Sequence, residues 1–242
     1  MNILGIIPAR YGSTRFPGKP LTDISGKSMI QRVYEQALKS RSLKKIIVAT
    51  DDERIAEHVK KFGGDVSMTS SDHQSGTDRC AEVLRKVNGK FDAVINIQGD
   101  EPFINPEQID LVASCFENPK TEIASLIKKI ISEEEIRNPN IVKAIKNLEG
   151  NAIYFSRSPI PYRRNPEVEI TYFKHIGIYG YRSETLLKII KLPQSRLELA
   201  ESLEQLRWIE NGFVIHLRET DYESFSVDTP ADLKHVEKFL KN

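Results

Sequence analysis

The sequence predicts an α/β fold with a mainly parallel sheet covered by helices on both faces. Apolar segments of strand length alternate with amphipathic helical segments through the first half of the 242 residues. A basic loop with two glycines follows the first apolar segment. Alternation of strands and helices is typical of parallel sheets, and open sheets of this kind bind ligands at the carboxyl ends of their strands. The first loop therefore stands where such a fold places a ligand.

The expected elements follow one another without a linker, a repeat or a low-complexity tract. Short apolar runs predict strands, and apolar residues three or four apart predict helices. In the first half we expect strands at residues 2–8, 45–49, 65–68 and 91–97, and helices at 28–39, 53–62, 77–87 and 106–116. In the second half we expect strands at residues 123–128, 141–145, 152–155, 175–181 and 213–217, and helices at 183–190, 197–210 and 230–240.

The whole chain, residues 1–242, is expected to form one domain. The pattern becomes rich in strands at about residue 122, and prolines mark turns at 158–162 and 165–166. We interpret approximately residues 122–182 as a strand-rich insertion within that domain, because no flexible linker separates them from the rest.

Composition limits the function classes. The 35 Lys and Arg residues nearly balance 34 Asp and Glu residues, so no overall positive field favours nucleic acid as a partner. A hydrophobic content of 39% is enough for a core. Cys80 and Cys115 lack the C-x-x-C spacing of a zinc or redox pair. With no signal peptide or membrane-spanning stretch in the pattern, we expect a cytoplasmic protein that does not insert into membranes.

The loop after the first strand has the composition of a polyphosphate site. It carries three cations and two glycines, namely Arg10, Arg15, Lys19, Gly12 and Gly18. Glycines let backbone N–H groups approach an anion, while the cations supply fixed positive charge. Five residues separate the glycines and Pro20 follows the lysine, which excludes a Walker loop, and a G-x-G-x-x-G dinucleotide motif is missing as well. The alternative is an ordinary surface loop with solvated charges.

Acidic residues follow two later strands. The motif Gln98-Gly99-Asp100-Glu101-Pro102 ends an apolar strand, and Asp228 stands in similar surroundings just before Pro230. Carboxylates at such positions can hold the Mg²⁺ that accompanies a nucleoside triphosphate. Each acid could instead cap the helix that follows, and for Glu101 and Asp228 this alternative is at least as good.

A polar loop, residues 69–79, opens the third helix. Ser75 and Asp78 are spaced as a capping box, which accounts for them structurally but gives no reason for Gln74 and Arg79. The N-terminus of this helix, with Arg79 on its first turn, is suited to bind a phosphate or the edge of a base.

Two aromatic segments combine rings with charged and polar groups. Residues 154–162 include Arg157, and residues 175–182 include His175 and Arg182. Arginine binds a carboxylate through two parallel hydrogen bonds, and neutral histidine or tyrosine can contact sugar hydroxyls. These features favour an acidic sugar as a ligand, although aromatic residues that alternate along a strand more often belong to a core.

Eight motifs in order resemble one family nearly from end to end. They are Ile7–Pro20, Val48–Asp52, Asp72–Arg79, Gln98–Pro102, Tyr154–Pro161, His175–Tyr181, Leu203–Arg207 and Val227–Pro230. The chain is thereby similar to the 3-deoxy-manno-octulosonate cytidylyltransferase (CMP-Kdo synthetase) family. The resemblance implies a Rossmann-like nucleotidyltransferase fold, a homodimer built partly through the insertion, and transfer of CMP from CTP to Kdo in lipopolysaccharide biosynthesis, with Mg²⁺ as cofactor.

The resemblance also implies roles for individual residues. The CTP-binding set would be Arg10, Gly12, Ser13, Lys19, Gln74, Ser75, Gly76 and Arg79. The sugar-binding set would be Gln98, Arg157, His175, Tyr181, Glu204 and Gln205. Asp100 and Asp228 would bind the metal, and together with Arg10 and Lys19 they would form the catalytic set.

One position departs from the family pattern. Ser226 stands where members often have glycine before the valine of the last motif, and its side chain would narrow the sugar pocket. This departure bears on the acceptor more than on the chemistry, so an 8-amino analogue of Kdo stays open as the acceptor. A cytidylyltransferase for another acidic sugar or for a polyol phosphate also stays open, as does a CTP-binding protein without turnover.

Overall fold

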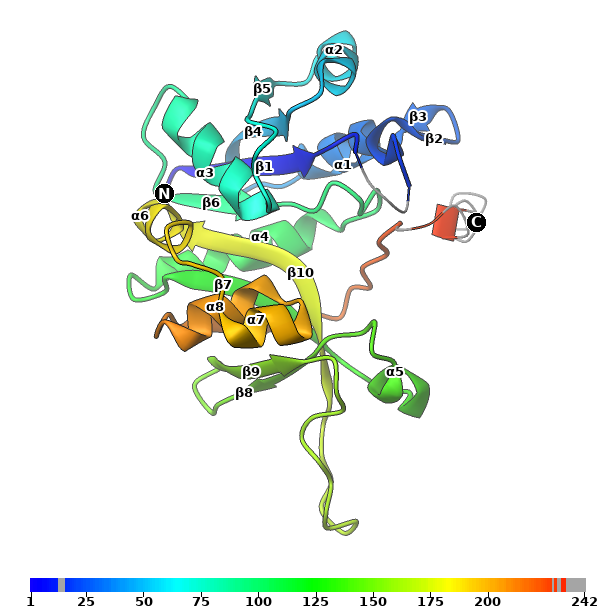
Figure 1. Cartoon of the computed structure of the whole chain (residues 1–242), viewed down its shortest axis with the longest axis vertical. Helices are drawn as coiled ribbons and strands as arrows, with labels where there is room; N and C mark the ends of the chain where they lie inside the picture. The colour runs from blue at the N-terminus through cyan, green and yellow to red at the C-terminus, as the bar shows by residue number, and fades with distance from the viewer. Residues whose placement is uncertain (13–15, 228, 230–231, 234–242) are drawn as a thin grey trace.

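In the computed structural model, which describes residues 1–12, 16–227, 229, 232 and 233, a nine-stranded sheet forms the centre of the molecule (Figure 1). Its strands are β1 (Ile3–Ala9), β4 (Leu43–Thr50), β5 (Val66–Met68), β6 (Ala93–Asn96), β7 (Ile123–Lys129), β8 (Lys143–Lys146), β9 (Ala152–Ser156), β10 (Phe173–Arg182) and β11 (Ile215–Glu219). A separate small hairpin consists of β2 (Asp23–Ile24) and β3 (Lys27–Ser28).

The sheet is mixed and mainly parallel, as predicted. The strand order is β11-β7-β10-β6-β1-β4-β5, with β8 paired to β10 and to β9. β1 runs parallel to β4 and β6, β4 to β5, and β7 to β11, whereas β10 is antiparallel to both β6 and β7. The carboxyl ends of β1, β4 and β6 therefore meet at one edge, as expected for a ligand-binding sheet.

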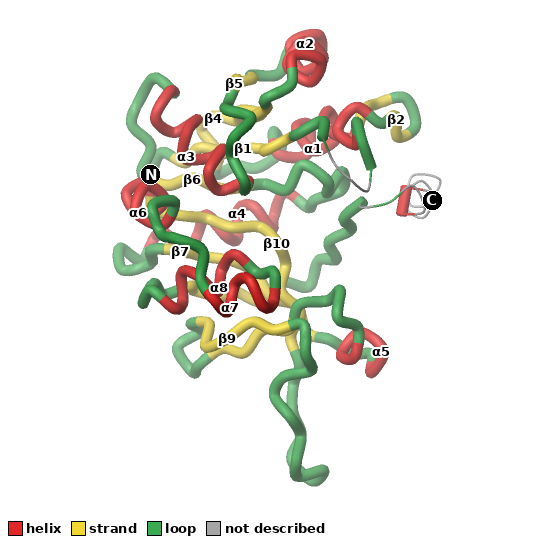
Figure 2. The backbone as a smooth tube through the Cα atoms, viewed as in Figure 1, coloured by secondary structure: helices red, strands yellow, loops and turns green. Residues whose placement is uncertain are grey.

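Helices cover both faces of this sheet (Figure 2). The helices are α1 (Met29–Ala37), α2 (Glu53–Lys61), α3 (Gly76–Lys86), α4 (Pro106–Ser114), α5 (Glu133–Arg137), α6 (Ser183–Ile189), α7 (Arg196–Glu201) and α8 (Glu204–Glu210), with 3-10 turns η1 (Lys19–Leu21) and η2 (Cys115–Glu117). Ile3 and Ile7 of β1 pack in the core formed with α1, α2 and α4, while Leu4 and Ile6 pack in the core formed with α3, α6 and α8. Alternate side chains of a strand point to opposite faces, so β1 serves both cores.

Three local features differ from the sequence prediction. The single helix expected at 197–210 is two helices, because Ser202 adopts a left-handed conformation with φ 52° between α7 and α8. This turn directs Leu203 into the core, where it is 6% exposed. The short helix α5 and the β2–β3 hairpin were not predicted. The helix expected at 230–240 lies outside the described residues except for 232 and 233.

The segment 122–182 begins and ends in the main sheet, since β7 and β10 are neighbours there. Between them, β8 and β9 pair with each other at the lower side of the molecule, and the chain from β9 to β10 projects away from the body (Figure 1). Tyr162 on this projecting chain is 86% exposed. Among the helices formed by the described residues, none has the length and apolar character to cross a membrane.

Candidate active site

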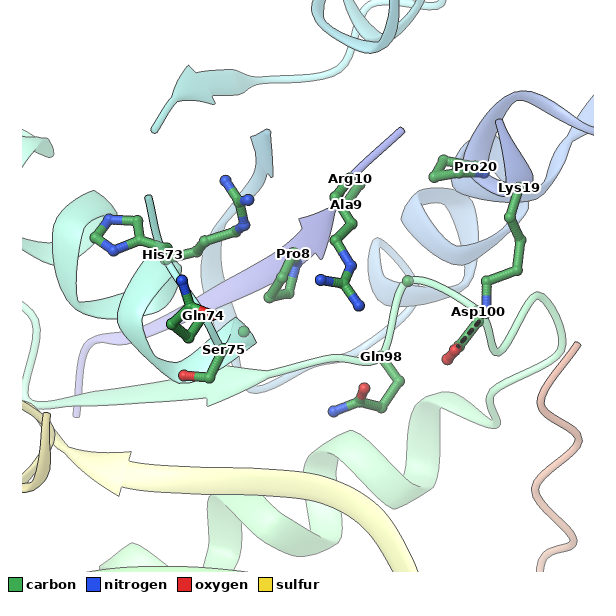
Figure 3. A pocket seen from close by; sticks show the side chains of 13 residues that line it. Pro8, Ala9, Arg10, Lys19, Pro20, His73, Gln74, Ser75, Gln98 and Asp100 are labelled. Carbon is green, nitrogen blue, oxygen red and sulfur yellow. Dashed lines mark hydrogen bonds and ion pairs between the residues drawn. The ribbon is translucent and has the colours of Figure 1, made fainter. Parts of the chain in front are cut away.

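Two clefts meet at the carboxyl end of β6. The first, of about 270 Å³, lies between the ends of β1 and β6 and the start of α3 (Figure 3). The second, of about 680 Å³, lies between β10, the α5 region and residues 223–226. Gln98 and Asp100 line both clefts. These two side chains therefore stand where contents of one cleft would meet contents of the other.

The first cleft contains most of the residues predicted to bind a nucleotide. They are Arg10, Lys19, Gln74, Ser75, Gly76 and Arg79, and they come from the loop after β1 and from the start of α3. Gly12 is exposed on the same loop, and Ser13 lies outside the described residues. The topology thus brings two motifs that are about sixty positions apart in the sequence to one cleft.

The loop after β1 is closed at its base. Gly18 has a φ of 73°, a conformation that favours glycine, and its N–H donates to the carbonyl of Tyr11 at 3.0 Å. The guanidinium carbon of Arg54 on α2 lies 3.4 Å from the centre of the Tyr11 ring. Lys19 then begins η1, and its Nζ lies 2.8 Å from Oδ2 of Asp100 (Figure 3). The closed loop therefore places a cation at the junction of the two clefts.

The start of α3 forms the opposite wall of the first cleft. The predicted capping box is confirmed: Ser75 Oγ accepts from the N–H of Asp78, and the carboxylate of Asp78 accepts from the N–H of Ser75. A Cβ on Gly76 would lie 3.3 Å from Pro8, so glycine lets the helix start press against the end of β1. The first turn of a helix has N–H groups without intrahelical partners, which makes this wall suited to anions.

Arg79 has a structural role that the sequence did not reveal. Its side chain is buried, and its guanidinium donates to Asp51 Oδ2 at 2.7 Å, to Thr69 Oγ1 at 2.8 Å and to the carbonyl of Ser70 at 3.1 Å. These contacts join the loops that follow β4 and β5 to α3. Arg79 lines the cleft, but three of its N–H groups are already bound to the protein.

Gly99 brings the loop after β6 against β1. A Cβ at this position would lie 2.6 Å from the carbonyl oxygen of Pro8, which no side chain could accommodate without a backbone shift. The neighbouring Gln98 donates from Nε2 to the carbonyl of Gly177 at 2.9 Å. The carbonyl of Asp100 accepts from the N–H of Val227 at 2.9 Å. Asp100 is thereby fixed between β1 and the C-terminal segment.

Asp228, the second predicted metal ligand, lies outside the described residues. Among the residues that the structure describes, no three His, Cys, Asp or Glu side chains gather as a metal group. Val227, the residue before Asp228, donates its N–H to the carbonyl of Asp100. The C-terminal segment therefore contacts Asp100 at the position just before the second acid.

The second cleft is lined by Arg157 and His175 and by residues 223–226. Two groups of the Arg157 guanidinium bind the protein: Nε donates to the carbonyl of Glu201 at 2.7 Å, and Nη1 to the carbonyl of Pro139 at 3.0 Å. An arginine has five N–H groups, so this leaves donors for a ligand.

His175 is a neutral group in this cleft. Its ring centre lies 5.1 Å from that of Phe155 and 5.2 Å from that of Tyr179, and Nε2 shares a hydrogen bond of 2.9 Å with Ser125 Oγ. Burial of the ring lowers the pKa of His175 to about 3. The imidazole therefore carries no charge at neutral pH, and with Nε2 bound to Ser125 its Nδ1 is the nitrogen left for a ligand.

The low pKa predicts a pH dependence of stability. An unfolded histidine takes up a proton near pH 6.5, whereas folded His175 does so near 3, so the free energy of unfolding falls as the pH drops from 6.5 toward 3. The variant His175→Phe should remove this loss, and its stability relative to the unmodified protein should rise by about 1.4 kcal/mol per pH unit below pH 6. Urea unfolding at pH 7, 6, 5 and 4 measures it. Parallel stability curves for the two proteins would contradict the lowered pKa of His175.

The remaining predicted sugar-binding residues do not line this cleft. Tyr181 is fully buried, with its ring 6.0 Å from Tyr179 and 5.5 Å from Trp208. Gln205 is buried on α8. Glu204 accepts from Thr77 Oγ1 at 2.8 Å and lines a hollow beside the start of α3, and burial raises its pKa. The structure thus brings Gln98, Arg157 and His175 together and places these three residues toward α3.

Several residues of the second cleft had no signal in the sequence. Lys174 lies 2.8 Å from Glu135 and 3.1 Å from Glu223, and so joins α5 to the C-terminal segment. The sequence left Glu101 as a cap or a ligand; its side chain is buried and accepts a hydrogen bond from Ser224, and burial raises its pKa to about 7. The cap of α4 is Asn105. Ser226, which the sequence singled out, lines this cleft. The contacts of Lys174 and Glu101 join distant segments, which no local pattern reports.

Comparison with known proteins gives consistent matches over the whole chain. A family model described as cytidylyltransferase matches residues 4–235. The chain is 57% identical to the 3-deoxy-manno-octulosonate cytidylyltransferase of Bacteroides thetaiotaomicron, covering 100% of this chain and 99% of that one. It is 47% identical to the protein of the same name from Geobacter sulfurreducens, covering 100% of both.

Solved structures of known proteins are also similar to this chain. A structure of CMP:2-keto-3-deoxy-manno-octonic acid synthetase complexed with CTP is similar with a TM-score of 0.94 and 46% identity, covering 100% of this chain and 99% of that chain. The 4-diphosphocytidyl-2C-methyl-D-erythritol synthase of Anaerococcus prevotii is similar with a TM-score of 0.66 at 14% identity, covering 100% and 96%. This second likeness extends to the fold alone.

Proposed function

Because the chain belongs to the cytidylyltransferase family, we propose that it transfers CMP from CTP to 3-deoxy-D-manno-octulosonate (Kdo) and releases diphosphate. The observation that carries this proposal is the junction of two clefts at Gln98 and Asp100. One cleft has the cations and helix start that suit a nucleotide, and the other has an arginine and a neutral histidine that suit a hydroxylated acid. A transfer reaction needs its two substrates to meet in this way.

CTP is proposed to occupy the first cleft. Arg10, Lys19 and Ser13, with the backbone at Gly12, would bind the triphosphate, because this loop supplies the positive charge. Gln74, Ser75 and Gly76 would lie along the cytidine, where the start of α3 offers N–H groups. Arg79 would support this wall through its contacts to Asp51 and the loop after β5.

The acceptor is proposed to occupy the second cleft. Arg157 would bind its carboxylate, His175 its hydroxyl groups, and Gln98 the end nearest the nucleotide. For Tyr181, Glu204 and Gln205, a role in acceptor binding rests on the resemblance alone. Tyr181 and Gln205 are buried, Glu204 accepts from Thr77, and none of the three lines this cleft.

Mg²⁺ is the proposed cofactor, with Asp100 and Asp228 as the residues that would hold it. The donor set fits, because carboxylates are the hard ligands that Mg²⁺ prefers, and the hydrogen bond from Val227 to Asp100 supports a meeting of the two acids. When bound, the ion supplies positive charge near the phosphates and lowers the pKa of an oxygen nucleophile.

The chain's own residues would act by positioning and by charge. The anomeric hydroxyl of the acceptor attacks the α-phosphorus, its proton leaves to solvent, and the bond to diphosphate breaks. Holding both reactants in line can remove about 7–11 kcal/mol of the barrier. Arg10 and Lys19 would balance the negative charge of the departing diphosphate, and Arg157 would keep the acceptor from rotating away.

We propose a homodimer as the working form, with contacts from residues 122–182. Tyr162, Val168 and Ile153 in this segment are 86%, 50% and 54% exposed, and these apolar side chains are available for contacts with a second copy. The proposed location is the cytoplasm, where CTP is available and where free thiols such as Cys80 and Cys115 persist. The product would serve lipopolysaccharide assembly.

The test is an assay of diphosphate release by the purified chain with CTP, Mg²⁺ and Kdo, with mass spectrometry of the CMP-sugar. Parallel assays use the 8-amino analogue of Kdo, a sialic acid and a polyol phosphate, because Ser226 lines the acceptor cleft. Turnover with Kdo that ends on addition of a chelator is the expected result. CTP binding without diphosphate release for any acceptor would refute the proposal.

A further inference from the structure

Lys143 on β8 is fully buried. Among the described residues, its side chain donates hydrogen bonds to main-chain carbonyls. Its Nζ donates to the carbonyls of Asn138 at 2.9 Å, Ile141 at 2.6 Å and Arg157 at 2.5 Å. An ammonium group has three donors, so each has an acceptor. Burial and the neighbouring Arg157 lower the pKa of Lys143, and Glu201 offsets part of this effect. Such a group is costly to bury, so its role lies in what it holds.

Two of the three carbonyls belong to the loop between α5 and β8. Residues 138–141 belong to no helix or strand, and residues 139 and 140 form a turn after α5. Pro139 lies between the two carbonyls that Lys143 binds, and the carbonyl of Pro139 accepts from Nη1 of Arg157 at 3.0 Å. The ammonium therefore fixes the loop that receives one arm of this guanidinium.

The third carbonyl belongs to Arg157 itself. Arg157 follows the end of β9, and the register of the two strands places Lys143 opposite Ser156. The main-chain N–H of Arg157 donates to the carboxylate of Glu201 at 2.9 Å, while its carbonyl binds Lys143. Lys143 thus controls both the backbone from which the Arg157 side chain starts and the loop against which it rests.

We propose that Lys143 is a positioning residue that holds Arg157 in the orientation for binding the acceptor's carboxylate, without touching the acceptor. Lys143 is enclosed behind the second cleft, whereas Arg157, Asn140 and Ile141 line it. This inference rests on the proposed function, since it assigns Arg157 to the acceptor.

The test compares Lys143→Met, which keeps the length and removes the donors, with Lys143→Gln, which keeps amide donors. The control is Lys146→Met on the same strand, where the lysine pairs with Glu219. Each variant is checked for folding by circular dichroism, and KM is measured for CTP and for Kdo. Lys143→Met should raise the KM for Kdo by about tenfold or more, Lys143→Gln should raise it less, and the KM for CTP should stay within about twofold.

A double-mutant cycle separates positioning from a general loss of structure. In an Arg157→Met background, Lys143→Met should have no further effect on the KM for Kdo, because the group through which it acts is gone. A further rise of the KM for Kdo in that background would overturn the inference, and so would an equal rise of both KM values in Lys143→Met. The inference is also overturned if folded Lys143→Met has the same KM values as Lys146→Met, or if neither Lys143 variant folds.

Failure of the proposed function has a different signature. An unmodified chain that releases no diphosphate from CTP and Kdo refutes the function before any variant is compared. Lys143 can then still be judged by a crystal structure of Lys143→Met, in which the Arg157 guanidinium should have left the carbonyl of Pro139. A guanidinium that stays in place would overturn the positioning role by itself.

Discussion

Asp100→Asn should lower kcat by about a thousandfold or more while the protein stays folded and still binds CTP. The substitution keeps the shape of the side chain but removes the negative charge at the junction of the two clefts. A neutral amide is a poor ligand for Mg²⁺, and it also loses the ion pair of 2.8 Å with Lys19. Single-turnover rates of CMP-Kdo formation at saturating CTP and Kdo measure the effect.

A matched control is Asp65→Asn. Asp65 pairs with Lys45 at 3.3 Å on the surface, so the control also removes a carboxylate from a lysine. Its kcat should stay within about twofold of the unmodified enzyme, because exposed pairs of this kind contribute little. If Asp100→Asn kept a kcat within about tenfold, Asp100 would have no role in metal binding or in catalysis.

Arg157→Met should raise the KM for Kdo by about a hundredfold with little change in the KM for CTP. Hydrogen bonds to a charged partner are worth about 1.5–3 kcal/mol, and a guanidinium can form two with one carboxylate. Nε and Nη1 are already bound to the carbonyls of Glu201 and Pro139, which fixes the direction of the remaining N–H groups. Initial-rate measurements with each substrate varied in turn check this expectation.

Two further variants sharpen the result. Arg157→Lys keeps the charge without the planar fork and should give an intermediate KM for Kdo. Arg137→Met removes an exposed arginine on α5 that pairs with Glu133, and it should leave both KM values unchanged. Equal KM values for Kdo in the unmodified enzyme and in Arg157→Met would exclude Arg157 from the acceptor site.

The sequence predicted the fold well where local patterns agree with tertiary packing. β1 is a good example, because its alternating residues serve two cores and its following loop lies at a position that the topology assigns to ligands. The split between α7 and α8 escaped prediction because Leu203 continues the apolar pattern of α7, while the left-handed residue Ser202 ends the helix. A backbone turn of one residue leaves almost no trace in periodicity.

The first cleft was more predictable than the second because local sequence patterns identify its walls. Its walls are the ends of parallel strands and a helix start, which motifs identify. The second cleft depends on contacts such as Lys174 with Glu135 and Glu223, which join segments far apart in the chain. Arg79 shows what a motif does not predict: its guanidinium binds Thr69 and Asp51 in neighbouring loops, and no local pattern indicates these contacts.

The shared wall at Gln98 and Asp100 has a consequence for inhibition. If the proposed sites are right, a product with a nucleotide at one end and a sugar acid at the other would span both clefts, and its second half would bind at a high effective concentration once the first half is bound. Synthetic molecules that tether a cytidine phosphate to an ulosonate surrogate by a short, stiff link should exploit this bivalency, and each half alone should bind far more weakly.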